Sequence, residues 1–128
     1  MTPTELMEKA SRALTSARLL LDAGDTDGAC NRAYYAMFDA ARAALAAAGG
    51  DGARDATKTH SGLITTFSLR FVKDGEFPVE LGKALNRVAE LRQTGDYTGM
   101  TTPEEKAGWA VAQAASFVAA VERLITKL

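Results

Sequence analysis

Hydrophobic residues along this chain recur every three to four positions, the spacing that places them on one side of an α-helix. Five segments show this pattern, and none sustains the every-second-residue alternation of a strand. The segments are Thr2 to about Ala23, Gly28 to Ala48, Thr59 to Lys73, Pro78 to about Gly95, and roughly 25 residues after Thr102. Because the turns are short, the pattern predicts an all-α fold, an antiparallel up-and-down bundle of about five helices.

Residues at the segment ends support these limits. Thr2, Pro3 and Glu5 form a helix-start pattern, in which the threonine caps free amides and the glutamate reaches back. The same pattern recurs at residues 102–105, before the last segment. The glycine-rich residues 49–52 predict the end of the second helix and a mobile loop that reaches about residue 58.

The last segment carries large apolar residues in near-heptad spacing, which predicts a long helix at the centre of the bundle. These residues are Trp109, Ala110, Ala114, Phe117, Val121, Leu124 and Leu128.

Length and composition narrow the classes of function. The 128 residues fit one domain, residues 1–128, and a net charge of -1 means that any nucleic-acid site is a local patch. One cysteine, Cys30, and one histidine, His60, exclude an intrachain disulfide and a Cys/His zinc site, so no metal or cofactor is expected. No signal-peptide pattern opens the chain and no apolar run reaches about 18 residues, which favours a soluble cytoplasmic protein without a membrane segment.

Three stretches carry a more specific signal. Residues 31–42 read Asn-Arg-Ala-Tyr-Tyr-Ala-Met-Phe-Asp-Ala-Ala-Arg, residues 58–63 read Lys-Thr-His-Ser-Gly-Leu, and residues 92–97 read Arg-Gln-Thr-Gly-Asp-Tyr. In this order, and followed by an alanine-rich last helix, they resemble the small stand-alone proteins of the HEPN family (higher eukaryotes and prokaryotes nucleotide-binding). The resemblance covers nearly the whole chain.

This resemblance implies a helical bundle that usually forms a homodimer. Such proteins are often encoded with a minimal nucleotidyltransferase, as a toxin and antitoxin pair or as an accessory subunit, and RNA or a nucleotide is the implied ligand. Many active members are ribonucleases that need no metal. In those, an arginine followed four to six residues later by a histidine forms the site, often across a dimer interface, where the ribose 2'-hydroxyl attacks the phosphate.

Only the arginine of that motif has a counterpart here. Four to six residues after Arg92 come Asp96, Tyr97 and Thr98, so no histidine occupies the expected position. One interpretation of Arg92 is phosphate binding, and the other is a structural arginine at the edge of the bundle.

Asp96 and Tyr97 are candidates for the missing role, each with a plainer alternative. Asp96 lies one helical turn after Arg92, which predicts an ion pair between them. Tyr97 points away from Arg92 unless Gly95 breaks the helix, and otherwise it is expected to pack beneath the following loop. Reference pKa values of about 3.9 for aspartate and about 10 for tyrosine make neither a ready substitute for imidazole.

His60 begins the third segment and aligns with Ile64, Phe67 and Phe71 on its apolar side. The plainer interpretation is a histidine satisfied at a helix end. The functional alternative is that it approaches Arg92 from a different helix and supplies the missing acid or base.

Arg32, Tyr35 and Arg42 are candidates for binding RNA or a nucleotide. Basic groups between aromatic residues can hold phosphates while the rings stack on bases. The plainer interpretation places Tyr34 in the core with Tyr35 at its border, and pairs Asp39 with Arg42.

Three functions follow from these observations. The first is a HEPN partner subunit of a minimal nucleotidyltransferase, with a nucleotide- or RNA-binding role. The second is a metal-independent ribonuclease toxin at a dimer interface, and the third is a ligand-free helical oligomerisation module. The candidate catalytic residues are Arg92, Asp96, Tyr97 and His60.

Overall fold

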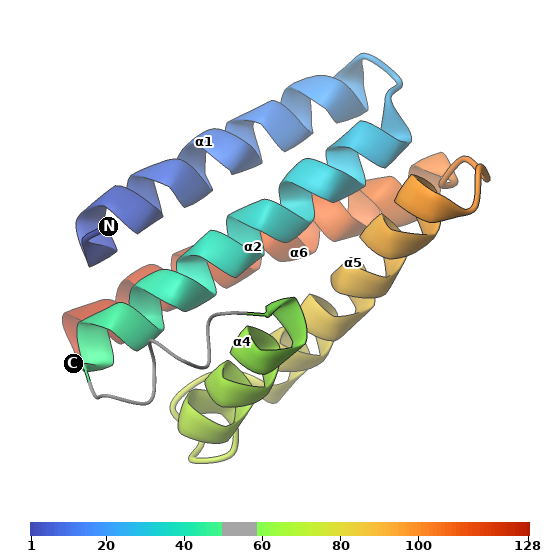
Figure 1. Cartoon of the computed structure of the whole chain (residues 1–128). Helices are drawn as coiled ribbons and strands as arrows, with labels where there is room; N and C mark the ends of the chain where they lie inside the picture. Colours follow the sequence, from blue (N-terminus) through green and yellow to red (C-terminus); the bar gives the residue numbers. More distant parts are fainter. Residues whose placement is uncertain (50–58) are drawn as a thin grey trace.

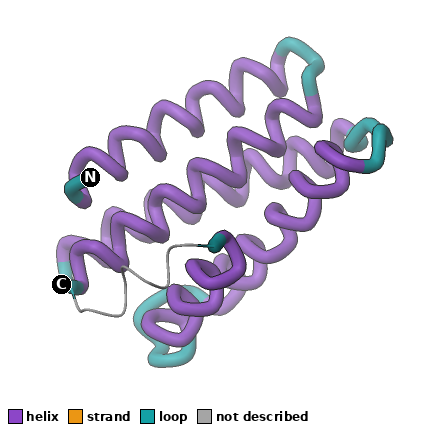
Figure 2. Tube along the Cα trace, in the orientation of Figure 1, coloured by secondary structure: helices purple, strands orange, loops and turns teal. Residues whose placement is uncertain are grey.

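The computed structural model describes residues 1–49 and 59–128, and within these ranges every regular element is helical (Figures 1 and 2). The elements are α1 (Pro3–Asp22), α2 (Thr26–Ala48), α4 (His60–Phe67), the π-helical segment η1 (Ser68–Val72), α5 (Val79–Tyr97) and α6 (Glu104–Thr126). Because η1 continues α4, the predicted five-helix bundle is confirmed. The predicted loop falls mostly on residues 50–58, outside the described residues.

Local hydrogen bonds explain where several helices begin. The Oγ1 atom of Thr2 accepts from the Glu5 backbone N–H at 3.1 Å, and the Thr2 N–H donates to Oε1 of Glu5 at 3.0 Å. The predicted capping pattern at residues 102–105 is wrong: the residue before α6 is Pro103, which offers no side-chain cap. Thr102 instead donates its backbone N–H to Oδ1 of Asp27 at 2.9 Å, so this threonine ties the loop before α6 to the first turn of α2.

α2 is the central helix, because it packs against α1, α4, α5 and α6. The last helix does not hold this position, contrary to the expectation from its length. Alanine side chains on α2 allow neighbouring helices to approach closely from several directions. The buried alanines of α2 are Ala29, Ala33, Ala36, Ala40, Ala41, Ala43 and Ala44.

Two residues of the predicted apolar stripe are exposed: Trp109, at 39%, lies on α6, and Leu128, at 47%, lies beyond its end. The buried side of α6 includes Ala107, Ala110 and Ala114. Because adjacent helical positions differ by about 100°, Trp109 lies to the side of this stripe.

An aromatic cluster attaches α4 and the turn before α5 to α6. The ring of Phe117 lies 5.5 Å from that of Phe67 and 4.9 Å from that of Phe77, between ring centroids. Phe67 and Phe71 are fully buried. This cluster fixes the position of α4, and therefore of His60 at its first residue.

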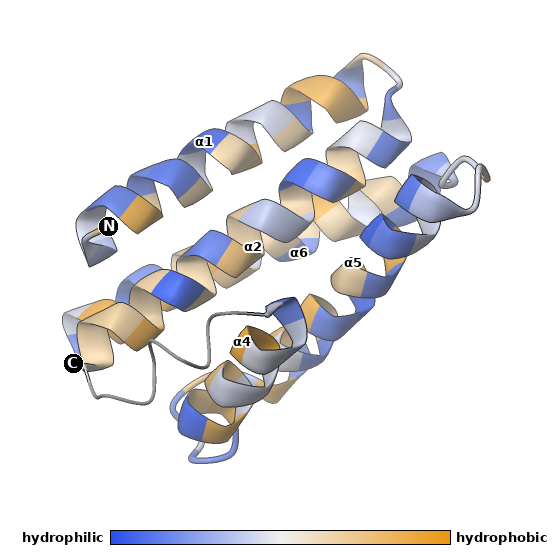
Figure 3. Cartoon of the chain, in the orientation of Figure 1, coloured by the Kyte–Doolittle hydropathy of each residue, from blue (hydrophilic) through white to orange (hydrophobic). Residues whose placement is uncertain are grey.

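Consecutive helices α1 and α2 run in opposite directions, as do α4 and α5, and α5 and α6 (Figure 1). Hydrophilic and hydrophobic residues alternate along the helices, as expected for helices with one buried side (Figure 3). Among the described helices, none combines the length and apolarity needed to cross a bilayer.

Candidate functional site

Three aromatic rings form one patch on α2. Tyr34 and Tyr35 have ring centroids 5.1 Å apart, and the Phe38 ring lies 5.8 Å from that of Tyr34. Phe38 lies three residues after Tyr35 and four after Tyr34, so its ring is one helical turn from both, 6.1 Å and 5.8 Å between centroids. Tyr34 is buried while Tyr35 is partly exposed, which confirms the predicted division between core and border.

His60 covers this patch from the start of α4. Its ring centroid lies 4.5 Å from that of Phe38, 5.5 Å from Tyr34 and 5.8 Å from Tyr35. The first turn of α4 is fixed because Oγ1 of Thr59 accepts from the Gly62 backbone N–H at 2.9 Å. The imidazole therefore has a defined place on the aromatic patch while it remains accessible to solvent.

Arg92 reaches the same rings from α5. Its guanidinium carbon lies 4.9 Å from the ring centroid of Tyr34 and 5.6 Å from that of Tyr35, within cation–π range. Its Nη1 donates to Oδ2 of Asp96 at 3.2 Å, which confirms the predicted ion pair. Its Nε is buried and has no hydrogen-bond partner among the described residues.

We call Arg32, Tyr34, Tyr35, Phe38, His60 and Arg92 the aromatic–basic cluster. Arg32 belongs to it because its guanidinium carbon lies 5.3 Å from the Tyr35 ring centroid. The Nε of Arg32 is also buried without a partner in the described part of the chain. Two arginine side chains, those of Arg32 and Arg92, thus lie within cation–π range of the same ring, that of Tyr35.

The environment shifts two pKa values in the cluster. Desolvation against the aromatic rings, and secondly the positive charge of Arg92, lower the pKa of His60 below its ordinary value of 6.5. The imidazole is therefore mostly neutral at pH 7. Burial raises the pKa of Tyr34 to about 12, with Arg92 opposing this shift, so the phenol stays protonated.

A cavity of about 400 Å³ opens beside the cluster. On its wall, Nη1 of Arg42 donates to Oδ1 of Asp39 at 3.3 Å, as the spacing of these residues predicted. The cavity is lined by Lys9, Arg32, Tyr35, Phe38, Asp39, Arg42 and His60.

Tyr97 lies apart from the cluster's buried side and is 75% exposed. Both expectations for it are wrong, since it neither packs beneath the loop nor turns back on a broken helix. α5 continues through Gly95 to Tyr97. A Cβ at Gly95 would lie 2.9 Å from Oδ1 of Asp27 and 3.3 Å from Oγ1 of Thr102, so the glycine permits close packing rather than a turn.

The structure thus brings His60 and Arg92 onto the same rings, with Asp96 paired to Arg92, and places Arg32, Tyr35 and Arg42 around the adjoining cavity, which His60 also lines. Sequence reasoning missed Lys9, which reaches the cavity from α1. No local motif could have found it, because its approach depends on how α1 packs on α2. Asp39 was anticipated as the partner of Arg42 but not as a cavity wall.

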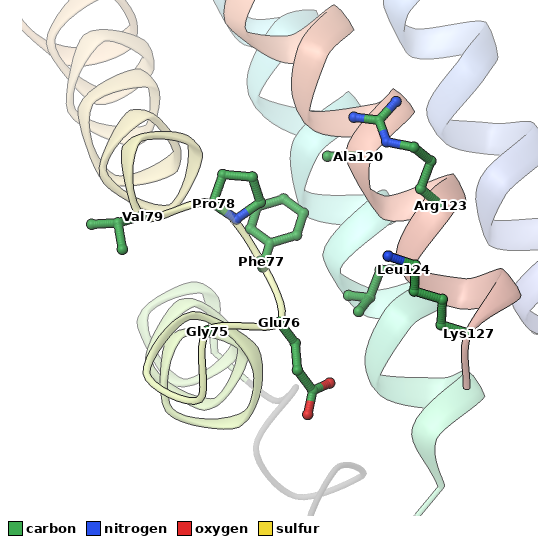
Figure 4. A pocket seen from close by; sticks show the side chains of 9 residues that line it. All are labelled: Gly75, Glu76, Phe77, Pro78, Val79, Ala120, Arg123, Leu124 and Lys127. Atoms are coloured by element: carbon green, nitrogen blue, oxygen red, sulfur yellow. The ribbon is translucent and has the colours of Figure 1, made fainter.

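Two further hollows lie elsewhere. One, of about 420 Å³, lies where Phe77 and Pro78 at the start of α5 face Arg123 and Lys127 on the last turns of α6 (Figure 4). The other, which we call the α5–α6 groove, measures about 880 Å³ and contains the exposed Trp109. None of the candidate catalytic or binding residues lines either hollow.

Comparisons with known proteins place the chain among relatives of similar size. The HEPN domain model matches residues 4–124. A UPF0332 protein of Thermotoga maritima is 38% identical over 122 residues, which cover 94% of this chain and 88% of the relative. A protein of Methanocaldococcus jannaschii named "Putative toxin" is 30% identical over 123 residues, covering 96% and 88%. A second protein of that organism with this description is 34% identical over 93 residues, covering 73% and 60%.

Proposed function

The chain belongs to the HEPN family, and on that basis we propose that it is the RNA- or nucleotide-binding subunit of a toxin–antitoxin pair whose partner is a minimal nucleotidyltransferase. Support for the toxin–antitoxin role comes from the two relatives named "Putative toxin". Support for ligand binding comes from the aromatic–basic cluster and the cavity beside it.

The observation that carries the ligand proposal is the placement of Arg32 and Arg92 on the Tyr35 ring, each with a buried Nε donor that has no hydrogen-bond partner among the described residues. Buried donors are nearly always satisfied, and an orphaned one in a native structure calls for an explanation. The guanidinium carbons of Arg32 and Arg92 lie 5.3 Å and 5.6 Å from the centroid of the Tyr35 ring. A phosphate oxygen is the acceptor that a guanidinium binds best.

Local charge supports the same ligand. Lys9, Arg32, Arg42 and Arg92 contribute four positive charges around the cavity and cluster, against two negative charges from Asp39 and Asp96. Counted over the described residues, this region is therefore positive although the chain carries a net charge of -1. Such a local patch is what binding of a polyanion requires.

Fluorescence anisotropy with a labelled single-stranded RNA tests this proposal. We expect Arg32→Ala and Arg92→Ala each to weaken binding at least tenfold and to reduce its salt dependence, since each removes a phosphate contact. Arg18→Ala is the matched control, because Arg18 is exposed on α1. Equal affinity in all four proteins would reject the site.

Metal-independent RNA cleavage is a second candidate, favoured by the contact of His60 and Arg92 with the same tyrosine rings. The neutral imidazole can accept the proton of a ribose 2'-hydroxyl while Arg92 stabilises the charge on the phosphate. The 2'-oxygen then bonds to phosphorus and the bond to the 5'-oxygen breaks. The products are a 2',3'-cyclic phosphate and a 5'-hydroxyl, whose oxygen takes the proton that the His60 imidazole had accepted, so the imidazole returns to its neutral form.

Cleavage of cellular RNA in the presence of a chelator separates binding from catalysis. A nuclease loses activity in both His60→Phe and Arg92→Ala, while retained RNA binding in His60→Phe, which keeps an aromatic ring, identifies the histidine as the proton carrier. Cleavage by neither the native chain nor its dimer, with RNA binding intact, leaves the binding subunit as the function.

A homodimer formed through the α5–α6 groove is part of the proposal. The groove exposes Trp109, and its rim balances Arg87 and Lys106 against Glu90 and Glu105, so a second copy can pair opposite charges. Light scattering should report a dimer for the native chain and a monomer for Trp109→Asp. A native monomer at all micromolar concentrations would exclude this interface, and a dimer without RNA binding would favour a ligand-free oligomerisation module.

Co-expression with a minimal nucleotidyltransferase from the same genome tests the protein partner. The proposal expects a stable complex through size-exclusion chromatography. If the two proteins eluted separately at micromolar concentration, the nucleotidyltransferase would be ruled out as the partner.

A further inference from the structure

Asp39 is an unusual component of a cavity that is otherwise suited to an anion. Its residue is only 4% exposed, yet its side chain lines the cavity together with Lys9, Arg32 and Arg42. Burying a carboxylate costs free energy, and its negative charge repels phosphate. A site that recognised phosphate alone would therefore bind it more tightly without this carboxylate. The position of Asp39 therefore indicates recognition of another part of the ligand.

The carboxylate of Asp39 has spare capacity to accept hydrogen bonds. An ionised carboxylate offers two oxygens and about four lone-pair sites. Among the described residues, its one hydrogen bond joins Oδ1 to Nη1 of Arg42 at 3.3 Å. This bond also orients the carboxylate, because Arg42 lies one turn further along α2. No described residue donates to the oxygen Oδ2, which can accept donors from a molecule in the cavity.

Aromatic surface lies beside this acceptor. Phe38 precedes Asp39 on α2, and Tyr35 lies one turn earlier, so both rings line the same cavity. The imidazole of His60, against Phe38 at 4.5 Å, adds a third and solvent-accessible ring. A nucleobase held by these rings presents its hydrogen-bonding edge to the cavity wall that contains Asp39.

The donor pattern of the bases selects one of them. Guanine presents two adjacent donors, the ring N1–H and the 2-amino group, which match the two oxygens of a carboxylate. Adenine and cytosine offer one amino group next to an acceptor, and uracil offers one N–H between two acceptors. A cavity of about 400 Å³ is within the size range of small-molecule sites, which suits one nucleotide unit.

We propose that the cavity binds a guanosine monophosphate unit and that Asp39 determines its specificity for guanine. Asp39 accepts from the N1–H and the 2-amino group, the rings of Tyr35 and His60 hold the base, with the buried Phe38 ring packed behind His60, and the cationic side chains bind the phosphate. The unit is either the free nucleotide or part of a single-stranded RNA. This inference rests on the proposed function, because it specifies the ligand of the same site.

Calorimetric titration of the native protein with GMP, IMP, AMP and UMP tests the specificity. IMP differs from GMP only in lacking the 2-amino group. Because a hydrogen bond to a charged group is lost, we expect GMP to bind at least tenfold more tightly than IMP. Equal affinities for the four nucleotides would overturn the guanine assignment and leave the proposed binding function standing, whereas no binding of any nucleotide or of RNA would overturn both.

The variant Asp39→Asn distinguishes base recognition from a structural role. It keeps the size of the side chain, and circular dichroism checks that the variant folds like the native protein. We expect it to reduce the preference for GMP over IMP to below threefold while UMP affinity changes little. If the affinity for all four nucleotides fell by the same factor, Asp39 would only orient Arg42, and the inference would be overturned.

Lys9→Ala is the matched control: Lys9 lines the cavity and makes no hydrogen bond to Asp39 among the described residues, so its loss should weaken the binding of every nucleotide without altering the GMP to IMP ratio. Competition by short homopolymers then identifies the source of the unit. Guanine recognition within RNA is supported if oligoguanylate, or another guanine-containing single strand, displaces labelled GMP better than oligouridylate does. Displacement by GMP but by no RNA assigns the cavity to the free nucleotide.

Discussion

His60 and Arg92 belong to different helices, yet both lie against the ring of Tyr34. The imidazole centroid is 5.5 Å and the guanidinium carbon 4.9 Å from the centroid of that ring. The family motif places a histidine four to six residues after the arginine, and this chain has none there. The fold thus brings the one histidine of the chain near Arg92 by a different route, through the packing of α4 and α5 on α2.

Stability should depend on pH through His60. Its pKa is lowered in the folded state, by desolvation first and by Arg92 second, so the unfolded chain binds more protons between that pKa and the ordinary value of 6.5. The stabilisation is fully present above pH 6.5 and is lost as the pH falls through this window. Thermal unfolding between pH 5 and 8 should show this decrease, and His60→Gln should flatten it; an unchanged profile in the variant would assign the decrease to other groups.

Replacing Arg92 should cost stability as well as ligand binding. Its side chain is only 15% exposed, and it combines a cation–π contact with the ion pair to Asp96. Arg92→Ala should therefore lower the free energy of unfolding by about 1–2 kcal/mol. Urea denaturation measures this, with Asp96→Ala as the comparison, which should cost less than about 1 kcal/mol because the cation–π contact remains. A larger loss in Asp96→Ala than in Arg92→Ala would contradict this ranking.

Gly95 should not tolerate alanine, although alanine favours helices. The new Cβ would lie 2.9 Å from Oδ1 of Asp27, the atom that accepts the backbone N–H of Thr102. Gly95→Ala should lower the free energy of unfolding by about 1–2 kcal/mol through overpacking. Gly108→Ala is the control, because no atom lies within 4 Å of a Cβ there, and it should stabilise by roughly 0.5–1 kcal/mol. If both substitutions stabilised the protein, the Asp27 side chain would have moved away from the new Cβ without loss of stability, which would contradict this prediction.

Tyr97 should contribute little to the stability of the isolated chain. Because 75% of the residue is exposed, Tyr97→Ser should change the free energy of unfolding by about 0.5 kcal/mol or less. Chemical denaturation of the two proteins gives the comparison. A loss above about 2 kcal/mol would mean that the ring is buried in solution, for instance in a dimer, and dilution would then reduce the difference.

The sequence determined the helices because their signals are local. Repeating apolar positions and the capping residues Thr2 and Glu5 act within a few turns of chain, and the expected Arg92–Asp96 and Asp39–Arg42 pairs span a single turn. These interactions depend on helical spacing, which the order of residues fixes.

Only the tertiary structure decided which helix lies at the centre and which side chains meet. The approach of Lys9 to Arg32 and Asp39, the contact of His60 with Phe38, and the close packing at Gly95 all join segments that are distant in sequence. Helical periodicity gives the direction of a side chain around its own axis but not the neighbour it faces. That neighbour depends on how the alanine-rich faces of α2 allow other helices to approach, a property of packing between helices rather than of any one segment.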